Sequence, residues 1–367
     1  MKYKVVYIDD ETSQNSQAFA DGLSSQSLID ITIKLPTKFE ELISELIAEQ
    51  KDIDALILDL KLDGNQQGER TATYTAPSLA TGIRTKCFAE NGFENAFPIF
   101  LISSTNNLKK YYDSDTSSHD LFDFTFYKTS IAEKGKEYEQ MIASITHAYK
   151  AIQENRTNFN ELLGLPSDSE IPNKVFTSKF LLGEGTSISE ISQYIFNEII
   201  CKSGVLIDEN ILAARFGIDF NISKDWATLI ELLNDNKYSG IFKDSFHRWW
   251  ANDILNWWNS NFSKPLIQLT ALDRVNLLKD KFKLPNLVEA QQIDKTTSSK
   301  FWTVCQAYKL PLDPKDGFLL DGNLTHSWQD KRYLSLHSIL ERDAKTLGLL
   351  IHPAEKERLE DIKQEYK

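Results

Sequence analysis

Charged and polar side chains stand at the ends of several apolar runs in this sequence, where they are available for chemistry. Asp9 and Asp10 follow the run KYKVVYI, and Asp59 ends the run DALILD. Ser103 and Lys128 end two later runs, FPIFLIS and FDFTFYK. Apolar runs of this length are typical of strands that are buried on both faces of a sheet. An ionised side chain at the end of such a strand therefore needs an explanation.

Three carboxylates at one place repel one another unless a cation neutralises them. Oxygen ligands in a partly hydrated site suit Mg²⁺, so Asp9, Asp10 and Asp59 are predicted to bind this ion. With the Ser103 hydroxyl and the Lys128 cation nearby, one carboxylate oxygen can attack phosphorus, because Mg²⁺ and the lysine would neutralise the phosphoryl oxygens. Taken singly, each residue also has an ordinary interpretation, such as a helix N-cap pair, a solvated strand end or a surface lysine. Together, these ordinary interpretations require five coincidences.

The segments around these residues alternate between strand and helix patterns through the first 150 residues. A further strand is predicted at IDITIKL, between the first and second aspartate-bearing runs. The segment KFEELISELIAEQ has apolar residues at helical spacing, and YEQMIASITHAYKAIQEN predicts a long amphipathic helix. This alternation predicts a parallel sheet covered by helices on both sides, with the carboxyl ends of its strands at one edge.

The motifs IDDE, LILDLKLDG, FPIFLISS and FYKT, in this order, resemble those of receiver domains of bacterial response regulators. The resemblance covers residues 1–150 and implies an α/β flavodoxin-like fold, a doubly wound five-stranded parallel sheet. It implies that Asp59 is the phosphoacceptor. It also implies that Asp10 binds Mg²⁺ directly, that Asp9 does so largely through water, and that the Lys61 backbone carbonyl is another ligand.

The resemblance further implies that Ser103 hydrogen-bonds the phosphoryl group and that Lys128 pairs with its oxygens. The expected partner is a histidine kinase or a histidine phosphotransfer protein, and the expected activities are Mg²⁺-dependent self-phosphorylation and dephosphorylation. Two positions depart from the family, which usually has prolines where this chain has Asp63 and Thr129. The loop at 65–81 is also lengthened, either as a cover for the pocket or as a surface insertion.

The second part of the chain carries weaker signals. Residues 151–172 are predicted to be a helical extension and linker, and residues 173–367 a mainly α-helical output or interaction domain. Helices are expected near 187–202, 208–216, 224–235, 240–262, 270–282 and 333–367. The segment FKDSFHRWWANDILNWWNSNF predicts a buried core helix, with a docking face for a partner or for the receiver as the alternative.

Three functions are compatible with this organisation. The leading hypothesis is a phosphorelay response regulator that passes the change at Asp59 to an unknown output protein through its C-terminal domain. The second is a transcription regulator, because ENILAARFGIDFNISKDWATLIELL has a weak helix-turn-helix pattern. The third is an effector enzyme of a bacterial anti-phage system, switched by phosphorylation, although the C-terminal half shows no catalytic constellation. A homodimer is left open.

Composition and charge restrict the environment of the protein. The 367 residues carry a net charge of −12, with −8 in residues 1–150 and −4 in residues 151–367. Neither half has the basic balance that binding to a phosphate backbone needs, so nucleic acid is not the expected partner. Three distant cysteines fit no disulfide framework or zinc spacing. Without a signal peptide or an apolar run of about 20 residues, a cytoplasmic protein without a membrane span is expected.

Overall fold

The computed structural model describes residues 2–64, 72–87, 89–111, 120–183, 185–322 and 326–365. The chain folds into two compact units. The first comprises Met1–Phe196 with Ser239–Phe246, and the second comprises Asn197–Tyr238 with His247–Lys367. Residues 65–71 of the lengthened loop lie outside the described residues, and its last part, from residue 76, belongs to the helix Ala76–Lys86. The two expectations for the role of the loop remain untested.

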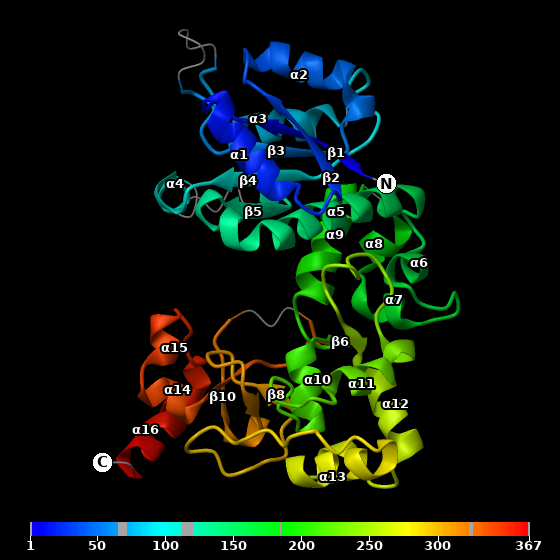
Figure 1. Cartoon of the computed structure of the whole chain (residues 1–367), viewed down its shortest axis with the longest axis vertical. Coiled ribbons are helices and arrows are strands. Elements are labelled where there is room, and N and C mark those ends of the chain that lie inside the picture. The colour runs from blue at the N-terminus through cyan, green and yellow to red at the C-terminus, as the bar shows by residue number, and fades with distance from the viewer. Residues whose placement is uncertain are drawn as a thin grey trace. The chain divides into compact units, whose positions relative to one another are not determined.

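The first unit is built on a five-stranded parallel sheet with the order β2-β1-β3-β4-β5 (Figure 1). Two of the interior strands, β3 and β4, are buried at every residue, which is why they appear in the sequence as apolar runs. This strand order is that of the flavodoxin-like fold and confirms the architecture predicted for residues 1–150. The strands are β1 (Tyr3–Ile8), β2 (Ile29–Lys34), β3 (Ala55–Asp59), β4 (Ile99–Ser103) and β5 (Phe124–Tyr127).

Helices cover both faces of this sheet. On one face, apolar side chains of α2 and α3 form a single core cluster with the strands. On the other face, the ring of Phe126 in β5 lies 4.7 Å from that of Tyr138 in α5. A Cβ atom at Gly135 of α5 would come within 2.3 Å of the Gly22 carbonyl oxygen, so α1 and α5 can approach this closely because Gly135 has no side chain. The helices are α1 (Ser13–Leu23), α2 (Phe39–Ala48), α3 (Ala76–Lys86), α4 (Thr105–Tyr111) and α5 (Ile131–Glu154), with the 3₁₀ turns η1 (Gln50–Asp52) and η3 (Lys128–Ser130).

The first unit continues beyond the sheet into short helices. Asn158 caps the first of them, and Gly164 ends it in the left-handed conformation. These helices belong to the same compact unit as the sheet. The boundaries predicted at 150 and 172 remain predictions. The short helices are α6 (Phe159–Leu163), α7 (Ile171–Val175), α8 (Ser178–Leu182) and α9 (Ile188–Tyr194), followed by the π-helical segment η4 (Ile195–Ile200).

The second unit is mainly helical, as predicted, around a core that includes Phe216, Trp249 and Trp258. Three two-stranded ladders join its helices: β6 with β7, β8 with β9 and β10 with β11. The strands are β6 (Leu206–Ile207), β7 (Trp249–Trp250), β8 (Thr303–Val304), β9 (Pro311–Leu312), β10 (Gly317–Leu319) and β11 (Tyr333–Ser335). The helices are α10 (Glu209–Phe216), α11 (Trp226–Glu231), α12 (Ala251–Asn261), α13 (Ala271–Phe282), α14 (Leu336–Leu340), α15 (Asp343–Thr346) and α16 (Lys356–Glu365), with η5 (Asn234–Asn236), η6 (Leu266–Gln268), η7 (Pro314–Asp316) and η8 (Pro353–Glu355).

The helix expected near 240–262 is wrong in its first half. Only Ala251–Asn261 is helical, because Trp249 and Trp250 pair with β6 and Phe242 has a left-handed backbone with φ of 70°. The expected burial of the tryptophans is confirmed for Trp249 and Trp258, which are 1% and 0% exposed.

Two further features of the expected helices can be placed. In the helix-turn-helix candidate, Trp226 is buried and donates a hydrogen bond to Glu209, so its second helix packs into the core.

None of the helices in the described part of the chain combines the length and the apolar character that a membrane span requires.

A buried ion network holds the amino ends of β4 and β5 in the first unit. The Asp123 carboxylate accepts hydrogen bonds from Arg84 at 2.7 Å, from the Ile99 backbone at 2.9 Å and from the Tyr149 hydroxyl at 2.6 Å. The Asp123 side chain is 2% exposed. The network therefore joins α3, β4, β5 and α5 at the sheet edge opposite to the aspartates.

We expect Asp123→Ala to lower the free energy of unfolding of the first unit by about 3–5 kcal/mol, because Arg84 would lose its carboxylate while remaining buried. Tyr149→Phe removes one hydrogen bond to a charged group and should cost about 2 kcal/mol. Urea denaturation followed by circular dichroism measures both changes. A loss for Asp123→Ala no larger than that for Tyr149→Phe would contradict the role of this network.

Candidate functional site

The carboxyl ends of four neighbouring strands bring the predicted residues to one edge of the sheet. Asp9 follows β1, Asp59 ends β3, Ser103 ends β4 and Lys128 follows β5. The strand registers align these ends, since Asp59 lies opposite Ile102 and Ser103 lies opposite Tyr127. Asp9, Asp10 and Asp59 each present a carboxylate oxygen, and these oxygens all lie within 4.8 Å of one another. The predicted convergence of the three acidic side chains is therefore present in the structure.

Lys128 is the basic residue at the centre of this cluster. Its Nζ atom lies 2.9 Å from Asp59 Oδ1, 3.3 Å from Asp9 Oδ2 and 2.6 Å from Glu11 Oε1. The same atom lies 4.9 Å from the centre of the Phe19 ring. Burial lowers the pKa of Lys128, but the charges of Asp59 and Asp9 outweigh it, and the pKa rises above its ordinary value. The lysine is therefore a fixed positive charge that touches three carboxylates.

Asp9 is completely buried and held by hydrogen bonds on both carboxylate oxygens. Oδ2 accepts from the Tyr7 hydroxyl, from Ser16 Oγ at 3.2 Å and from Lys128, and Oδ1 accepts from the Glu11 backbone N–H at 3.1 Å. Tyr7 and Asp9 lie two residues apart, so their side chains point to the same side of the extended chain. With this many donors on it, Asp9 has a fixed orientation within the cluster.

Asp10 is half-buried and depends on a glycine for its position. Its Oδ2 atom accepts a hydrogen bond of 2.5 Å from the Gly64 backbone N–H. A Cβ atom at Gly64 would lie 2.3 Å from the same oxygen, closer than real contacts allow. The glycine in LDG therefore leaves space that the Asp10 carboxylate occupies.

The carboxylates of this site are suited to binding a further cation. Burial raises the pKa of Asp59 to about 7; Lys128 opposes this rise and Asp9 adds to it. Burial also raises the pKa of Asp10. Both shifts mean that burial disfavours the charged form of these carboxylates. A hard divalent cation with oxygen ligands, such as Mg²⁺, fits these donors and their charge.

The structure gives the positions of Ser103, Lys61 and Thr129, while the roles predicted for them remain predictions. Ser103 is 1% exposed at the end of β4, which brings it to the same edge as the aspartates. The Lys61 backbone N–H donates to Asp59 Oδ2 at 3.0 Å, while its carbonyl as a metal ligand remains a prediction. Thr129, in place of the usual proline, lies in η3, and its hydroxyl is 3.1 Å from that of Thr105.

Several contributors to the site were missed by reasoning from the sequence. Glu11 belongs to the IDDE motif but had no assigned role, although its carboxylate makes the shortest of the three contacts with Lys128. Tyr7 stands two residues before Asp9, and its polar hydroxyl in the buried part of β1 was the available signal. The contact between Gly64 and Asp10 joins two distant segments and left no local pattern.

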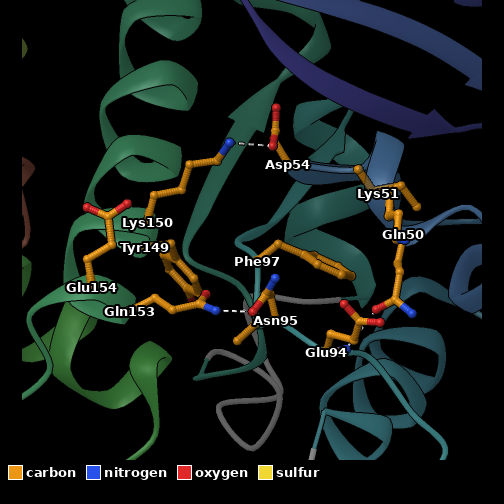
Figure 2. A pocket seen from close by; sticks show the side chains of 12 residues that line it. Gln50, Lys51, Asp54, Glu94, Asn95, Phe97, Tyr149, Lys150, Gln153 and Glu154 are labelled. Atoms are coloured by element: carbon orange, nitrogen blue, oxygen red, sulfur yellow. Dashed lines mark hydrogen bonds and ion pairs between the residues drawn. The ribbon is translucent and has the colours of Figure 1, made fainter.

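A cavity of about 330 Å³ lies elsewhere in the first unit, and Figure 2 shows the residues that line it. Two interactions join side chains that line it: an ion pair of 2.6 Å between Lys150 and Asp54, and a hydrogen bond from Gln153 to Asn95. It contains none of the aspartates or the lysine of the acidic cluster. Because these polar groups are partnered with one another, this cavity is not favoured as the site of chemistry.

No family model matches the chain, and no curated protein matches it. Among solved structures, the signal receiver domain of the NarL response regulator from Mycobacterium tuberculosis is 11% identical, with a TM-score of 0.24; the match covers 38% of this chain and 98% of that one. The RcsB response regulator of Salmonella typhimurium is 18% identical, with a TM-score of 0.25; the match covers 53% of this chain and 83% of that one. Both TM-scores are below 0.5, so the fold assignment rests on the strand order.

We expect Gly64→Ala to weaken Mg²⁺ binding by about 10- to 100-fold, because the new methyl group must displace the Asp10 carboxylate. Isothermal titration of the full chain with MgCl₂ measures this change. Gly185→Ala is the control: a Cβ atom there meets nothing within 4 Å, and its φ of 63° gives that variant a backbone strain that Gly64→Ala does not have. Equal Mg²⁺ affinity in Gly64→Ala and the wild type would show that Asp10 is not held as described.

Proposed function

We propose that this protein is a phosphorelay response regulator whose first unit accepts a phosphoryl group on Asp59 from a histidine kinase or a histidine phosphotransfer protein. The observation that supports this proposal is the arrangement around Asp59. Carboxylate oxygens of Asp59, Asp9 and Asp10 lie within 4.8 Å of one another, and Lys128 Nζ lies 2.9 Å from Asp59 Oδ1. A carboxylate nucleophile, an acidic metal site and a lysine are the groups that phosphoryl transfer to an aspartate requires.

In the proposed reaction, a carboxylate oxygen of Asp59 attacks the phosphorus of a phosphohistidine. A P–O bond forms, and the P–N bond breaks as its electron pair passes to the imidazole nitrogen, which takes up a proton from solvent. Lys128 exchanges part of its contact with Asp59 for the incoming phosphoryl oxygens, and Ser103 donates a hydrogen bond to one of them. Water then attacks the phosphorus of the acyl phosphate, the P–O bond to Asp59 breaks, and inorganic phosphate leaves as the Asp59 carboxylate is regenerated.

The chain would supply ligands for the cation that this chemistry needs. Asp10, Asp59 and the Lys61 carbonyl would hold Mg²⁺, which neutralises charge on the phosphoryl oxygens, and Asp9 would act on it largely through water. The hydrogen bonds on Asp9 suit this indirect role, because both of its oxygens already accept donors from the protein. Asp10 has the complementary role of a carboxylate positioned by a backbone N–H.

The C-terminal part has a separate place in this proposal. We propose that residues 173–367 bind an output protein, and that phosphorylation changes this binding. The switch needs only a few kcal/mol of difference between two packings of the chain. The buried position of Trp226 gives the transcription-regulator alternative no support from its second helix.

We expect radiolabelled phosphoryl groups to be incorporated into the full chain from acetyl phosphate or a phosphohistidine donor in the presence of Mg²⁺. Asp59→Asn should abolish incorporation because the nucleophilic carboxylate is lost. Asp54→Asn is the matched control: Asp54 is an aspartate just before β3, at the opposite end of the same strand. Labelling of Asp59→Asn at the wild-type level would rule out Asp59 as the phosphoacceptor.

Removal of the metal gives a second test on the same chain. Because the carboxylates around Asp59 repel an incoming phosphoryl group, an excess of EDTA should reduce wild-type labelling to the background of Asp59→Asn. Restoration by added MgCl₂ is the control. Labelling that continues undiminished in EDTA would contradict the proposed metal site.

A further inference from the structure

A row of five aromatic rings connects β5 with a segment of the chain more than 100 residues away. We call it the aromatic row: Phe126, Phe124, Phe196, Phe242 and Phe246. Consecutive ring centres are 5.1 Å apart for Phe126 and Phe124 and 6.3 Å apart for Phe124 and Phe196. Phe196 then contacts Phe242 at 5.3 Å and Phe246 at 5.2 Å. These distances are those of packed aromatic pairs.

The far end of the row lies in Ser239–Phe246, which we call the insert. The insert belongs to the first unit, while the residues before and after it, up to Tyr238 and from His247, belong to the second. The Ile241 backbone N–H donates to the Leu162 carbonyl at 2.9 Å. Ser245 Oγ donates to the Gln140 carbonyl of α5 at 3.0 Å. The insert is therefore a part of the second half of the sequence that is docked on the first unit.

The docked insert contains a residue, Phe242, in an unfavourable backbone conformation. Phe242 has a φ of 70°, in the left-handed region that an L-amino acid with a bulky side chain rarely adopts. Its side chain is nevertheless 1% exposed, packed in the aromatic row. Packing maintains this conformation, so a rearrangement of the row would favour its release.

The near end of the row adjoins the acidic site. Phe126 is fully buried and lies two residues before Lys128, whose Nζ atom contacts Asp59, Asp9 and Glu11. A phosphoryl group on Asp59 would compete with these carboxylates for contact with Lys128. Because Lys128 directly follows β5, the end of that strand would then change its position. The rings of Phe126 and Phe124 stand on that short strand and would move with it.

We propose that the insert reports the state of Asp59 to the second unit: phosphorylation repacks the aromatic row and loosens the insert from the first unit. This inference rests on the proposed function. Both ends of the insert continue into the second unit, so loosening changes the restraints on that unit through the chain itself. The coupling requires two packings of the row, of which the acidic site favours one or the other.

Hydrogen exchange measured by mass spectrometry on the full chain tests this inference. The probes are peptides that contain the amides of Ile241, Ser245 and Phe246, which donate hydrogen bonds to backbone carbonyls of Leu162 and Phe242. Beryllium fluoride with Mg²⁺ serves as the phosphoryl mimic. We expect these amides to exchange about tenfold faster with the mimic than with Mg²⁺ alone. Asp59→Asn should show no such response.

Two variants test the route. Phe124→Leu interrupts the aromatic row and should abolish the response of the insert while phosphoryl labelling of Asp59 continues. Phe180→Leu is the matched control: its ring packs on Phe176 and Tyr194, outside the row, and its response should equal that of the wild type. If Phe124→Leu fails to fold by circular dichroism, Phe246→Leu at the far end of the row takes its place with the same expectation.

The outcomes separate this inference from the proposed function. Labelled Asp59 with unchanged exchange in the insert overturns the inference and leaves the proposed function in place. A full response in Phe124→Leu or Phe246→Leu overturns the aromatic route. Absence of both labelling and mimic binding at Asp59 overturns the proposed function and the inference with it.

Discussion

A partly buried excess of negative charge is the constraint on which the first unit depends. Asp9, Asp10, Glu11 and Asp59 gather around one basic group, Lys128, at the carboxyl edge of the sheet. Burial of Asp59 raises its pKa to about 7; Lys128 opposes this rise and Asp9 adds to it. Such a site gains stability when a divalent cation enters it. In the proposed function, the cation adds to the positive charge that Lys128 places among these carboxylates.

The rest of the first unit keeps these charges in place despite their repulsion. The parallel strand order fixes which residues meet, and hydrogen bonds from Tyr7 and Ser16 fix the orientation of Asp9. At the opposite edge, the network around Asp123 holds the amino ends of β4 and β5. Lys128 follows β5 directly, and the aromatic row begins on the same strand. In the inference proposed above, β5 is the strand through which a chemical change at Asp59 affects the packing of the aromatic row.

Much of the fold and of the site follows from the sequence alone. Central parallel strands are buried on both faces, so their apolar runs were visible, and the aspartates at their ends had to converge once the strands were ordered. Contacts between distant segments left no such pattern. The hydrogen bond from Gly64 to Asp10 and the pairing of Glu11 with Lys128 depend on loop geometry. The helix expected near 240–262 was wrong because pairing of Trp249 and Trp250 with β6 overrides helical spacing.

The most direct test of the acidic cluster as a cation site is anomalous X-ray scattering. Crystals of the full chain would be soaked in MnCl₂, with Mn²⁺ as the stand-in for Mg²⁺. The expected result is one strong peak within about 2.3 Å of carboxylate oxygens of Asp10 and Asp59, with Lys128 still beside Asp59. A fully occupied peak elsewhere, with these carboxylates bound only to protein groups, would contradict it.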